Sequence, residues 1–310
     1  MLLSESRCVV LGAGGFIGTN LCRALNGKVS SLKAFGRRQA FPDAMKGVPW
    51  ITGDFSEPAS VAAVLGDTDV VYHLVNTSTP TSSNFDKMAD LESSVKPTIA
   101  MLEACREAGV KRVVFVSSGG TVYGVPKHIP TFEDAPTWPI TAYGVTKLAI
   151  EKYLFLFNHL YNLDFRVLRV ANPFGAFQST VKIHGAIMTF LQKAMDDRAI
   201  EIWGDGGTLR DYIYIDDVVS AILAASEHEG AEKVFNIGAG AGRSLNDIIH
   251  AIEKLLGRSL AVKYLNPRPG DVPRSVLDIS RAQADLGWSP QVSFEEGLKR
   301  TAEWLEVQQQ

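Results

Sequence analysis

Short apolar runs alternate with segments of helical periodicity through the first half of the chain. Uninterrupted apolar runs are typical of strands that are buried on both faces of a parallel sheet. The segments between them carry apolar residues at the three- and four-residue spacing of a helix. The expected strands are 8–11, 32–35, 70–74, 113–117 and 165–170, and the expected helices are Phe16–Leu25, 61–65, 96–108 and 142–160.

Beyond residue 171 this alternation gives way to mixed elements, with further helices expected at 185–195, 216–225, 245–256 and 294–306. Strands that alternate with helices predict an α/β fold with a doubly wound parallel sheet of the Rossmann type. We assign residues 1–171 to this dinucleotide-binding domain, with some later segments returning to it. Residues 172–310 form a smaller C-terminal α/β substrate domain, in which the proline- and glycine-rich segment 266–273 predicts a loop.

Composition narrows the class of protein. A hydrophobic content of 46% over 310 residues is ample for a packed core, and the net charge of −3 gives no basic surface for nucleic acid. The sequence shows neither a secretory leader nor an apolar run long enough to cross a bilayer. Three cysteines without close pairing favour the cytoplasm. Six histidines without ligand spacing predict no metal site.

A glycine pattern follows the first expected strand. Gly12, Gly15 and Gly18 join that strand to an apolar helix, which is the context in which the pattern indicates a dinucleotide site. Glycines let the backbone approach a pyrophosphate, whose charge is favoured at the amino end of a helix. We therefore expect the first helical turn, with Phe16 and Ile17, to contact the cofactor.

The end of the second expected strand departs from the usual pattern. An aspartate or glutamate normally binds the adenosine 2'-hydroxyl about 20 residues after the first glycine, whereas this chain has Gly36 followed by Arg37. NAD is the expected cofactor, and a guanidinium in this place makes NADP the alternative. The arginines at 37 and 38 are equally compatible with solvated loop charges.

Two further segments are expected at the cofactor. Asp54 and Phe55 lie between the expected strands 32–35 and 70–74 and are candidates for the adenine edge. The residues expected to pass the pyrophosphate and ribose, at the end of the next strand, are Leu74, Val75 and Asn76.

Tyr143 and Lys147 are the candidate catalytic pair. A four-residue separation on a helix places both side chains on one face, so an ammonium lies beside a phenol. Because an unperturbed tyrosine has a pKa near ~10, we expect Lys147 to lower the pKa of Tyr143 and make it an acid/base for hydride chemistry.

With these features together, the chain resembles the extended short-chain dehydrogenases/reductases, and specifically the NAD-dependent epimerase/dehydratase family. The resemblance covers nearly the whole length. Besides the glycine turn and the Tyr-Lys pair, it is carried by Ser-Ser-Gly-Gly-Thr-Val-Tyr-Gly at 117–124, Leu-Arg-Val-Ala-Asn-Pro-Phe-Gly at 168–175, Trp-Gly-Asp-Gly-Gly-Thr-Leu-Arg-Asp-Tyr at 203–212 and Arg-Pro-Gly-Asp at 268–271.

The resemblance implies roles for residues of both domains. It places Ser117 at the cofactor and Asn172 at the sugar diphosphate. Arg210 and Arg268 would clamp the phosphates, which agrees with the fit between a guanidinium fork and phosphate oxygens, and Asp271 would bind the nucleoside ribose. Ser275, four positions after Asp271, would face the sugar 2-substituent. Its small side chain would leave room for an N-acetyl group.

The chain departs from the family in one catalytic position. Four residues before Tyr123 the family usually has a serine or threonine that bonds the reacting hydroxyl, and this chain has Gly119. Ser118 and Thr121 are the two candidates for that duty. The related dehydratases carry an aspartate and a glutamate where this chain has Gly120 and Thr121. Without carboxyl groups to move protons, dehydration is disfavoured.

The family resemblance therefore implies a nucleotide-sugar 4-epimerase, acting on UDP-glucose and UDP-galactose, and possible UDP-N-acetylhexosamine turnover follows from the small Ser275. An NADPH-dependent reductase of a nucleotide-linked 4-keto sugar is the alternative within the same fold. A non-catalytic dinucleotide-sensing protein is a second alternative. By analogy with the family, helices 96–108 and 142–160 would pair across a two-fold axis in a homodimer, although their apolar faces also fit packing on the sheet.

Overall fold

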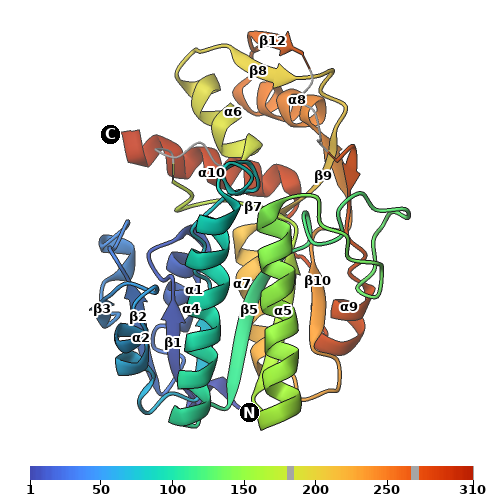
Figure 1. The fold of residues 1–310 in the computed structure, drawn as a ribbon. Helices are drawn as coiled ribbons and strands as arrows, with labels where there is room; N and C mark the ends of the chain where they lie inside the picture. The colour runs from blue at the N-terminus through green and yellow to red at the C-terminus, as the bar shows by residue number, and fades with distance from the viewer. Residues whose placement is uncertain (180–184, 267–271, 310) are drawn as a thin grey trace.

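The computed structural model describes residues 1–179, 185–266 and 272–309. A large parallel sheet with helices on both faces forms the lower part of the molecule in Figure 1, and a smaller α/β part lies above it. This is the α/β class that the sequence predicts.

Seven parallel strands make up the large sheet, in the order β10-β6-β5-β4-β1-β2-β3. The first and fourth strands in the chain are neighbours, so the strand order reverses between β1 and β4, where a doubly wound sheet binds its ligand. The bounds of the strands are β1 Arg7–Leu11, β2 Ser31–Gly36, β3 Trp50–Thr52, β4 Val70–His73, β5 Arg112–Ser118, β6 Asp164–Val170 and β10 Val234–Ile237.

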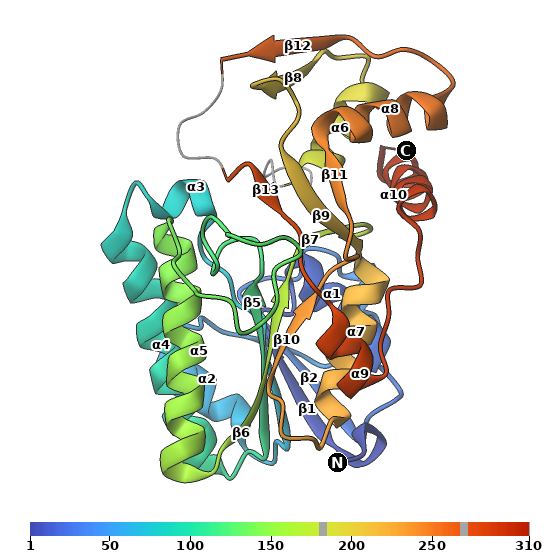
Figure 2. The ribbon, with the colours of Figure 1, turned by 90° about the vertical axis from the view of Figure 1, so that its right-hand side faces the viewer.

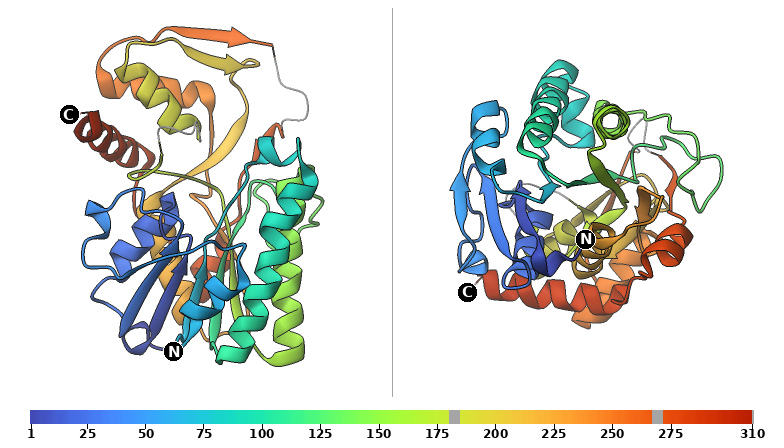
Figure 3. Two further views of the ribbon diagram at one scale, coloured as in Figure 1. Left: turned by 60° about the vertical axis from the view of Figure 1, so that its left-hand side comes forward. Right: turned by 90° about the horizontal axis from the view of Figure 1, so that it is seen from below.

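Each central strand is apolar on both faces, because helices cover both sides of the sheet. In β1, Cys8 and Val10 belong to one buried cluster, whereas Val9 and Leu11 belong to the other. Helices α1 (Phe16–Leu25) and α7 (Ile215–Glu227) pack on the first face, and α2 (Pro58–Leu65), α4 (Lys87–Ala108) and α5 (Ala142–Tyr161) pack on the second (Figure 3).

The long helix α4 begins well before the expected residue 96. Asp86 caps it by accepting a hydrogen bond from the Ala89 amide at 2.9 Å, and the turns that follow are mostly polar. Apolar periodicity therefore did not reveal them. The helix ends at Gly109, whose φ of 70° is left-handed, and α5 ends in the same conformation at Asn162, with φ 56°.

The smaller part covers the carboxyl ends of the parallel strands (Figure 2). Its first sheet contains β7 (Asn172–Phe174), β9 (Leu209–Tyr214), β11 (Gly242–Ser244) and β13 (Arg274–Ser275), and its second contains β8 (Ile200–Trp203) and β12 (Val262–Leu265). The remaining elements are α6 Ala186–Met195, α8 Leu245–Leu256 and α10 Phe294–Gln309, with the short η1 Leu3–Glu5, η2 Asp43–Met45, α3 Pro80–Ser83 and α9 Ser280–Leu286.

The chain crosses between the two parts more than once. After leaving the large sheet at β6 it builds β7 and β9, then returns with α7 and β10, which pairs with β6. As a result, the two parts share one continuous buried cluster that includes residues of β1, α7 and α8.

Two further findings bear on function. No helix within the described residues is both long and apolar enough to span a bilayer. Over the same residues no group of three or more histidine, cysteine, aspartate or glutamate side chains has the arrangement of a metal site.

Candidate functional site

The glycine turn and the end of β4 meet at the point where the strand order reverses. Gly12 has φ +85°, and a Cβ there would lie 2.9 Å from the backbone of Leu74 and Val75. Only glycine allows this close crossing. A Cβ at Gly18 would lie 2.3 Å from the Gly12 carbonyl oxygen, so α1 also packs directly on the turn. The first turn of α1, with Phe16 and Ile17, thus points its amino end at this crossing, where the helix dipole favours an anion.

One pocket brings the expected cofactor residues together with the catalytic pair. Val75 and Asn76, from the end of β4, line it beside Tyr143 and Lys147 of α5. The sequence separation of these two groups gives no hint of this proximity. The other lining residues are Phe55, His73, Ser93, Ser94, Thr146 and Ile150.

Tyr143 and Lys147 lie on one face of α5, as the spacing predicts. The Lys147 ammonium is 5.7 Å from the centre of the Tyr143 ring and 4.8 Å from that of Phe115. It donates a hydrogen bond of 3.1 Å to the Val116 carbonyl, which fixes it to β5. The Tyr143 hydroxyl has no hydrogen-bond partner among the described residues, and is available to a ligand in the pocket.

The expectation that Lys147 lowers the pKa of Tyr143 is wrong in this structure. Burial, and after it the charge of Asp90, raise the pKa of Tyr143 above its usual value. Burial also lowers the pKa of Lys147 to about 8, against the opposing effects of Asp90 and Glu151. The cause is desolvation, which outweighs an ammonium that lies 5.7 Å from the ring. Tyr143 is therefore a neutral phenol here, ready to donate a proton.

Asp90 is the charged group that sequence reasoning missed. It is 3% exposed on α4, and its two carboxylate oxygens accept hydrogen bonds from the hydroxyls of Ser78 and Thr146. Thr146 lies between Tyr143 and Lys147 on α5. A buried carboxylate is rarely retained without partners, and these hydroxyls hold it close to both catalytic side chains.

We expect the variant Asp90→Asn to shift the pH dependence of kcat/KM towards lower pH. Asp90 raises the pKa of Tyr143, so removal of its charge lowers that pKa and the basic form of the tyrosine appears at a lower pH. An amide keeps the capacity to bond Ser78 and Thr146. The pH profile between 6 and 10, measured for the purified variant, checks this.

Glu92→Gln is the matched control, because Glu92 is an exposed carboxylate on the same helix. Solvent screens its charge, so its pH profile should coincide with that of the unmodified protein. An Asp90→Asn profile that also coincides would contradict the electrostatic role.

Leu277 explains the glycine at position 119. A Cβ on Gly119 would lie 2.5 Å from a methyl carbon of Leu277 and 2.9 Å from the Arg169 carbonyl oxygen. The space that a serine or threonine side chain would need is therefore filled by a buried leucine. The hydroxyl that the family usually has here is sterically excluded, so another hydroxyl must act in its place.

The structure favours Thr121 over Ser118 for this duty. The hydroxyl oxygen of Thr121 is buried and has no hydrogen-bond partner among the described residues. The backbone carbonyl oxygen of Thr121 would be 2.8 Å from a Cβ on Gly144, the residue after Tyr143. A buried hydroxyl without a partner costs about 1–3 kcal/mol, which a bound alcohol would offset.

We expect Thr121→Val to lower kcat/KM by about 100-fold, as loss of a single well-placed hydrogen-bonding group does, and not to lower thermal stability. Valine has nearly the same shape and removes only the hydroxyl. Ser118→Ala is the comparison variant and should keep most of the activity. The opposite outcome, an active Thr121→Val and an inactive Ser118→Ala, would assign the role to Ser118.

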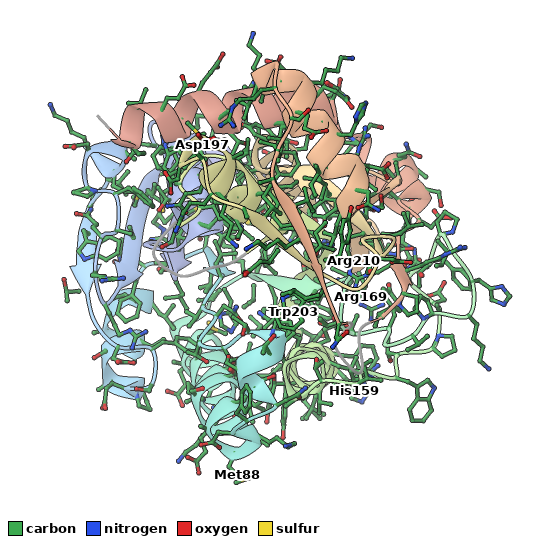
Figure 4. All side chains as sticks on the ribbon, turned by 90° about the horizontal axis from the view of Figure 1, so that it is seen from above. Met88, His159, Arg169, Asp197, Trp203 and Arg210 are labelled. Atoms are coloured by element: carbon green, nitrogen blue, oxygen red, sulfur yellow. The ribbon has the colours of Figure 1, made fainter. Side chains whose placement is uncertain are left out.

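A second pocket lies in the smaller part. Asn172 and Arg210, the two described residues expected at the sugar diphosphate, both line it. The side chain of Asn172 donates a 2.9 Å hydrogen bond to the Asp211 carbonyl, and Arg210 donates to the Leu209 carbonyl. Figure 4 labels Arg210 and Trp203, which also lines the pocket, near the centre of the view from above.

Other predicted site residues are placed as follows. The Asp54 carboxylate accepts hydrogen bonds from the amide and hydroxyl of Ser56. Ser275 is 8% exposed, and its backbone pairs with Arg210 across β13 and β9. Arg268 and Asp271 lie outside the described residues.

Ser117 belongs to a buried polar network below the catalytic pair. Its hydroxyl donates to Glu151, one helical turn after Lys147. Glu151 also forms an ion pair of 2.7 Å with Arg169 of β6, whose guanidinium bonds the Tyr123 hydroxyl at 2.9 Å and the Glu133 carbonyl at 2.8 Å. The Ser117 hydroxyl is thus engaged in supporting α5, rather than free towards a cofactor.

Sequence reasoning missed His73, Ser93 and Ser94 of the first pocket. Burial lowers the pKa of His73 to about 3, with a further contribution from Lys147, so the ring is neutral. Its Nε2 lies 2.9 Å from the Thr98 hydroxyl. Ser93 and Ser94 lie before the expected helix 96–108, in the turns of α4 that the sequence did not reveal, so no sequence signal pointed to this side of the pocket.

The family comparison matches most of the chain. A family model described as the NAD dependent epimerase/dehydratase family matches residues 8–238. UDP-glucose 4-epimerase of Mycolicibacterium smegmatis is 33% identical over 96% of this chain and 98% of that protein. A dTDP-4-dehydro-6-deoxyglucose reductase of Escherichia coli is 32% identical over 94% of this chain and 95% of its own length.

Among solved structures, the fold is similar to UDP-glucose 4-epimerase from Thermotoga maritima crystallised with UDP-glucose. The TM-score is 0.94 at 31% identity, and the match covers 98% of this chain and 100% of the other. The two pockets described above therefore lie within a region of shared fold.

Proposed function

The chain belongs to the NAD-dependent epimerase/dehydratase family, and from this premise we propose that it is a nucleotide-sugar 4-epimerase that interconverts UDP-glucose and UDP-galactose. The observation that carries the proposal is the convergence of Tyr143 and Lys147 with Val75 and Asn76 around one pocket. The Tyr143 hydroxyl, which can exchange a proton, thereby lies near the place where the glycine turn packs against the residues that follow β4.

One pocket serves the cofactor and the other serves the substrate. Residues 1–171 hold the dinucleotide, and residues 172–310 hold the nucleotide sugar. Arg210 and Asn172 are placed for the diphosphate, and we keep Arg268 and Asp271 in the proposal as the residues that complete this clamp. Because the sugar is held through its phosphates, its ring is free to turn over and present either face.

The fold implies NAD, and the residues around the first pocket fit it. A bound dinucleotide supplies hydride acceptance from sugar carbon 4 and hydride return to it. Tyr143 exchanges a proton with the 4-hydroxyl, and Lys147 keeps a positive charge beside it below a pH of about 8. The Thr121 hydroxyl bonds the same oxygen. Neither Gly120 nor Thr121 has the carboxyl group that dehydration requires.

The test is to incubate the purified protein with UDP-glucose, without added reductant, and to follow sugar configuration by proton NMR. We expect UDP-galactose to appear until equilibrium, with no net change in the absorbance of reduced nicotinamide. A protein that is folded and loaded with dinucleotide, yet leaves UDP-glucose unchanged, would refute the assignment. A parallel reaction with UDP-N-acetylglucosamine tests the prediction that the small Ser275 leaves room for an N-acetyl group. No turnover of this sugar would show that Ser275 does not determine which substrates are accepted.

A second candidate is a reductase of a nucleotide-linked 4-keto sugar. The relative of this activity in Escherichia coli, at 32% identity, and the missing acidic residue at Gly36 favour it. Both candidates use the same Tyr143 and Lys147, and cofactor behaviour separates them. A reductase consumes free NADPH in proportion to the 4-keto sugar added, whereas an epimerase shows no net oxidation.

Exposed apolar residues on two neighbouring helices support a homodimer. Met88 and Leu91 of α4, and Val145, Phe155 and Leu160 of α5, are all exposed. Figure 4 shows Met88 at the outer rim of the molecule. Several exposed apolar side chains on two neighbouring helices are typical of an interface. We propose that α4 and α5 pair with the same helices of a second copy, which sedimentation velocity would show as a dimer that Phe155→Glu converts to a monomer.

We place the reaction in the cytoplasm. Cys8, Cys22 and Cys105 are buried free thiols, which fits a reducing compartment.

A further inference from the structure

The end of β2 lies directly against the glycine turn. The amides of Gly12 and Ala13 both donate to the Phe35 carbonyl, at 3.0 and 3.1 Å. A Cβ on Gly14 would lie 2.2 Å from the Arg38 carbonyl oxygen, so the segment after Gly36 passes over the turn. Whatever follows the pyrophosphate on the adenosine side of a dinucleotide therefore meets residues 36–38.

Trp50 packs against the position from which a carboxylate side chain at residue 36 would extend. A Cβ on Gly36 would lie 3.2 Å from Cη2 of its indole ring, which is tighter than ordinary contact. The ring nitrogen donates a 3.1 Å hydrogen bond to the Thr52 hydroxyl, and this anchors the ring in β3. An aspartate or glutamate at position 36 would require the anchored ring to shift by a few tenths of an ångström. The acceptor that usually binds a free 2'-hydroxyl is thus both absent and sterically disfavoured.

The next two residues bring positive charge to the same place. Arg37 and Arg38 are exposed, and no carboxylate of the described residues forms a salt bridge with either. Arg37 is close enough to Asp54 to contribute to the lowered pKa of that carboxyl, after the stronger effect of the hydrogen bonds from Ser56. Since Asp54 is already bonded to Ser56, the guanidinium of Arg37 keeps its donors for another anion.

We propose that the adenosine end of the dinucleotide site accepts a ribose 2'-phosphate bound by Arg37, so that NADP binds more tightly than NAD. A guanidinium fork donates hydrogen bonds that phosphate oxygens accept. The indole of Trp50 disfavours a carboxylate at position 36, whose charge would repel the phosphate. This inference deepens the proposed function and rests on it only in placing a dinucleotide at the glycine turn.

The experiment compares two fragments of the cofactors, 2',5'-ADP and 5'-AMP, which differ only in the 2'-phosphate. Isothermal titration of each into the full chain gives the two dissociation constants without any sugar or turnover. We expect 2',5'-ADP to bind about tenfold or more tightly, as one charge-assisted contact provides. Equal binding, or tighter binding of 5'-AMP, would overturn the proposal.

Arg37→Ala should remove most of this preference and leave the affinity for 5'-AMP unchanged. Arg198→Ala is the matched control, since Arg198 is an exposed arginine in the smaller part, paired with Asp196. A preference that survives Arg37→Ala would overturn the assignment to this residue.

The dinucleotide released by denaturing the purified protein gives a second readout, because NAD and NADP differ in mass by one phosphate. We expect NADP in a preparation offered both. Exclusive release of NAD from such a preparation would contradict the inference. Neither result depends on which sugar is turned over, so this inference and the epimerase assignment fail separately.

Discussion

Replacing Tyr143 with phenylalanine is expected to lower kcat/KM by about 10²- to 10⁴-fold, which is the contribution of a positioned acid/base group. The substitution removes one oxygen atom and keeps the ring that faces Lys147. The hydroxyl has no hydrogen-bond partner within the described residues, so its loss leaves no buried group unsatisfied. Dinucleotide binding and the melting temperature should therefore match those of the unmodified protein.

Steady-state kinetics and a thermal melt of the same preparation separate chemistry from folding. Tyr153→Phe is a suitable control, because Tyr153 lies on the same helix and packs at the edge of the second core cluster, away from the pocket. Its activity should be unchanged. Full activity in Tyr143→Phe would remove this residue from the mechanism.

The largest effect on stability is expected from Arg169→Met. Arg169 is 5% exposed and is bonded to Glu151, Tyr123 and the Glu133 carbonyl. Methionine has a similar length but leaves the Glu151 carboxylate buried without its cation. Removing one partner of a buried ion pair costs about 3–5 kcal/mol of stability. Urea denaturation should therefore show a decrease of about 3–5 kcal/mol in the free energy of unfolding.

Arg106→Met provides the comparison. Arg106 forms its ion pair with Glu103 one turn earlier on the surface of α4, where such pairs contribute about 0.3–0.5 kcal/mol. Its unfolding midpoint should barely move. A small effect for Arg169→Met, similar to that of the control, would show that the buried network does not support β5, β6 and α5 as described.

The sequence revealed the parts of the fold whose residues carry a regular pattern. The strands around Val9 and Val114 are apolar on both faces, and this run of residues predicts a covered parallel sheet. The start of α4 lacked such a pattern. It depends on the Asp86 cap and on polar contacts such as that of Asp90, which become visible only when α5 packs alongside.

The candidate site could likewise be predicted only in part from the sequence. The positions of Tyr143 and Lys147 follow from helical spacing, and the glycine turn follows from its context. The pKa values do not, because burial by residues distant in the sequence outweighs the neighbouring ammonium. The glycine at 119 was visible as a departure, but its cause, the side chain of Leu277, lies more than 150 positions later in the chain.

The raised pKa of Tyr143 and the lowered pKa of Lys147 determine which of the two side chains loses its proton first as the pH rises. Tyr143 is protonated throughout the neutral range, while Lys147 begins to lose its proton near pH 8. The chain is thus built to return a proton to a sugar oxygen easily. To take one it needs the pocket's positive charge, and because Asp90 raises the pKa of Tyr143, we expect its removal to extend activity to lower pH.

Transfer of hydride away from sugar carbon 4 and back to the same carbon is the centre of this account, and deuterium at that carbon tests it directly. UDP-glucose labelled with deuterium at carbon 4 is incubated with the protein in ordinary water, and the product is analysed by NMR and mass spectrometry. We expect UDP-galactose that keeps its deuterium at carbon 4. Product in which that deuterium has been replaced by solvent hydrogen would contradict this hydride transfer.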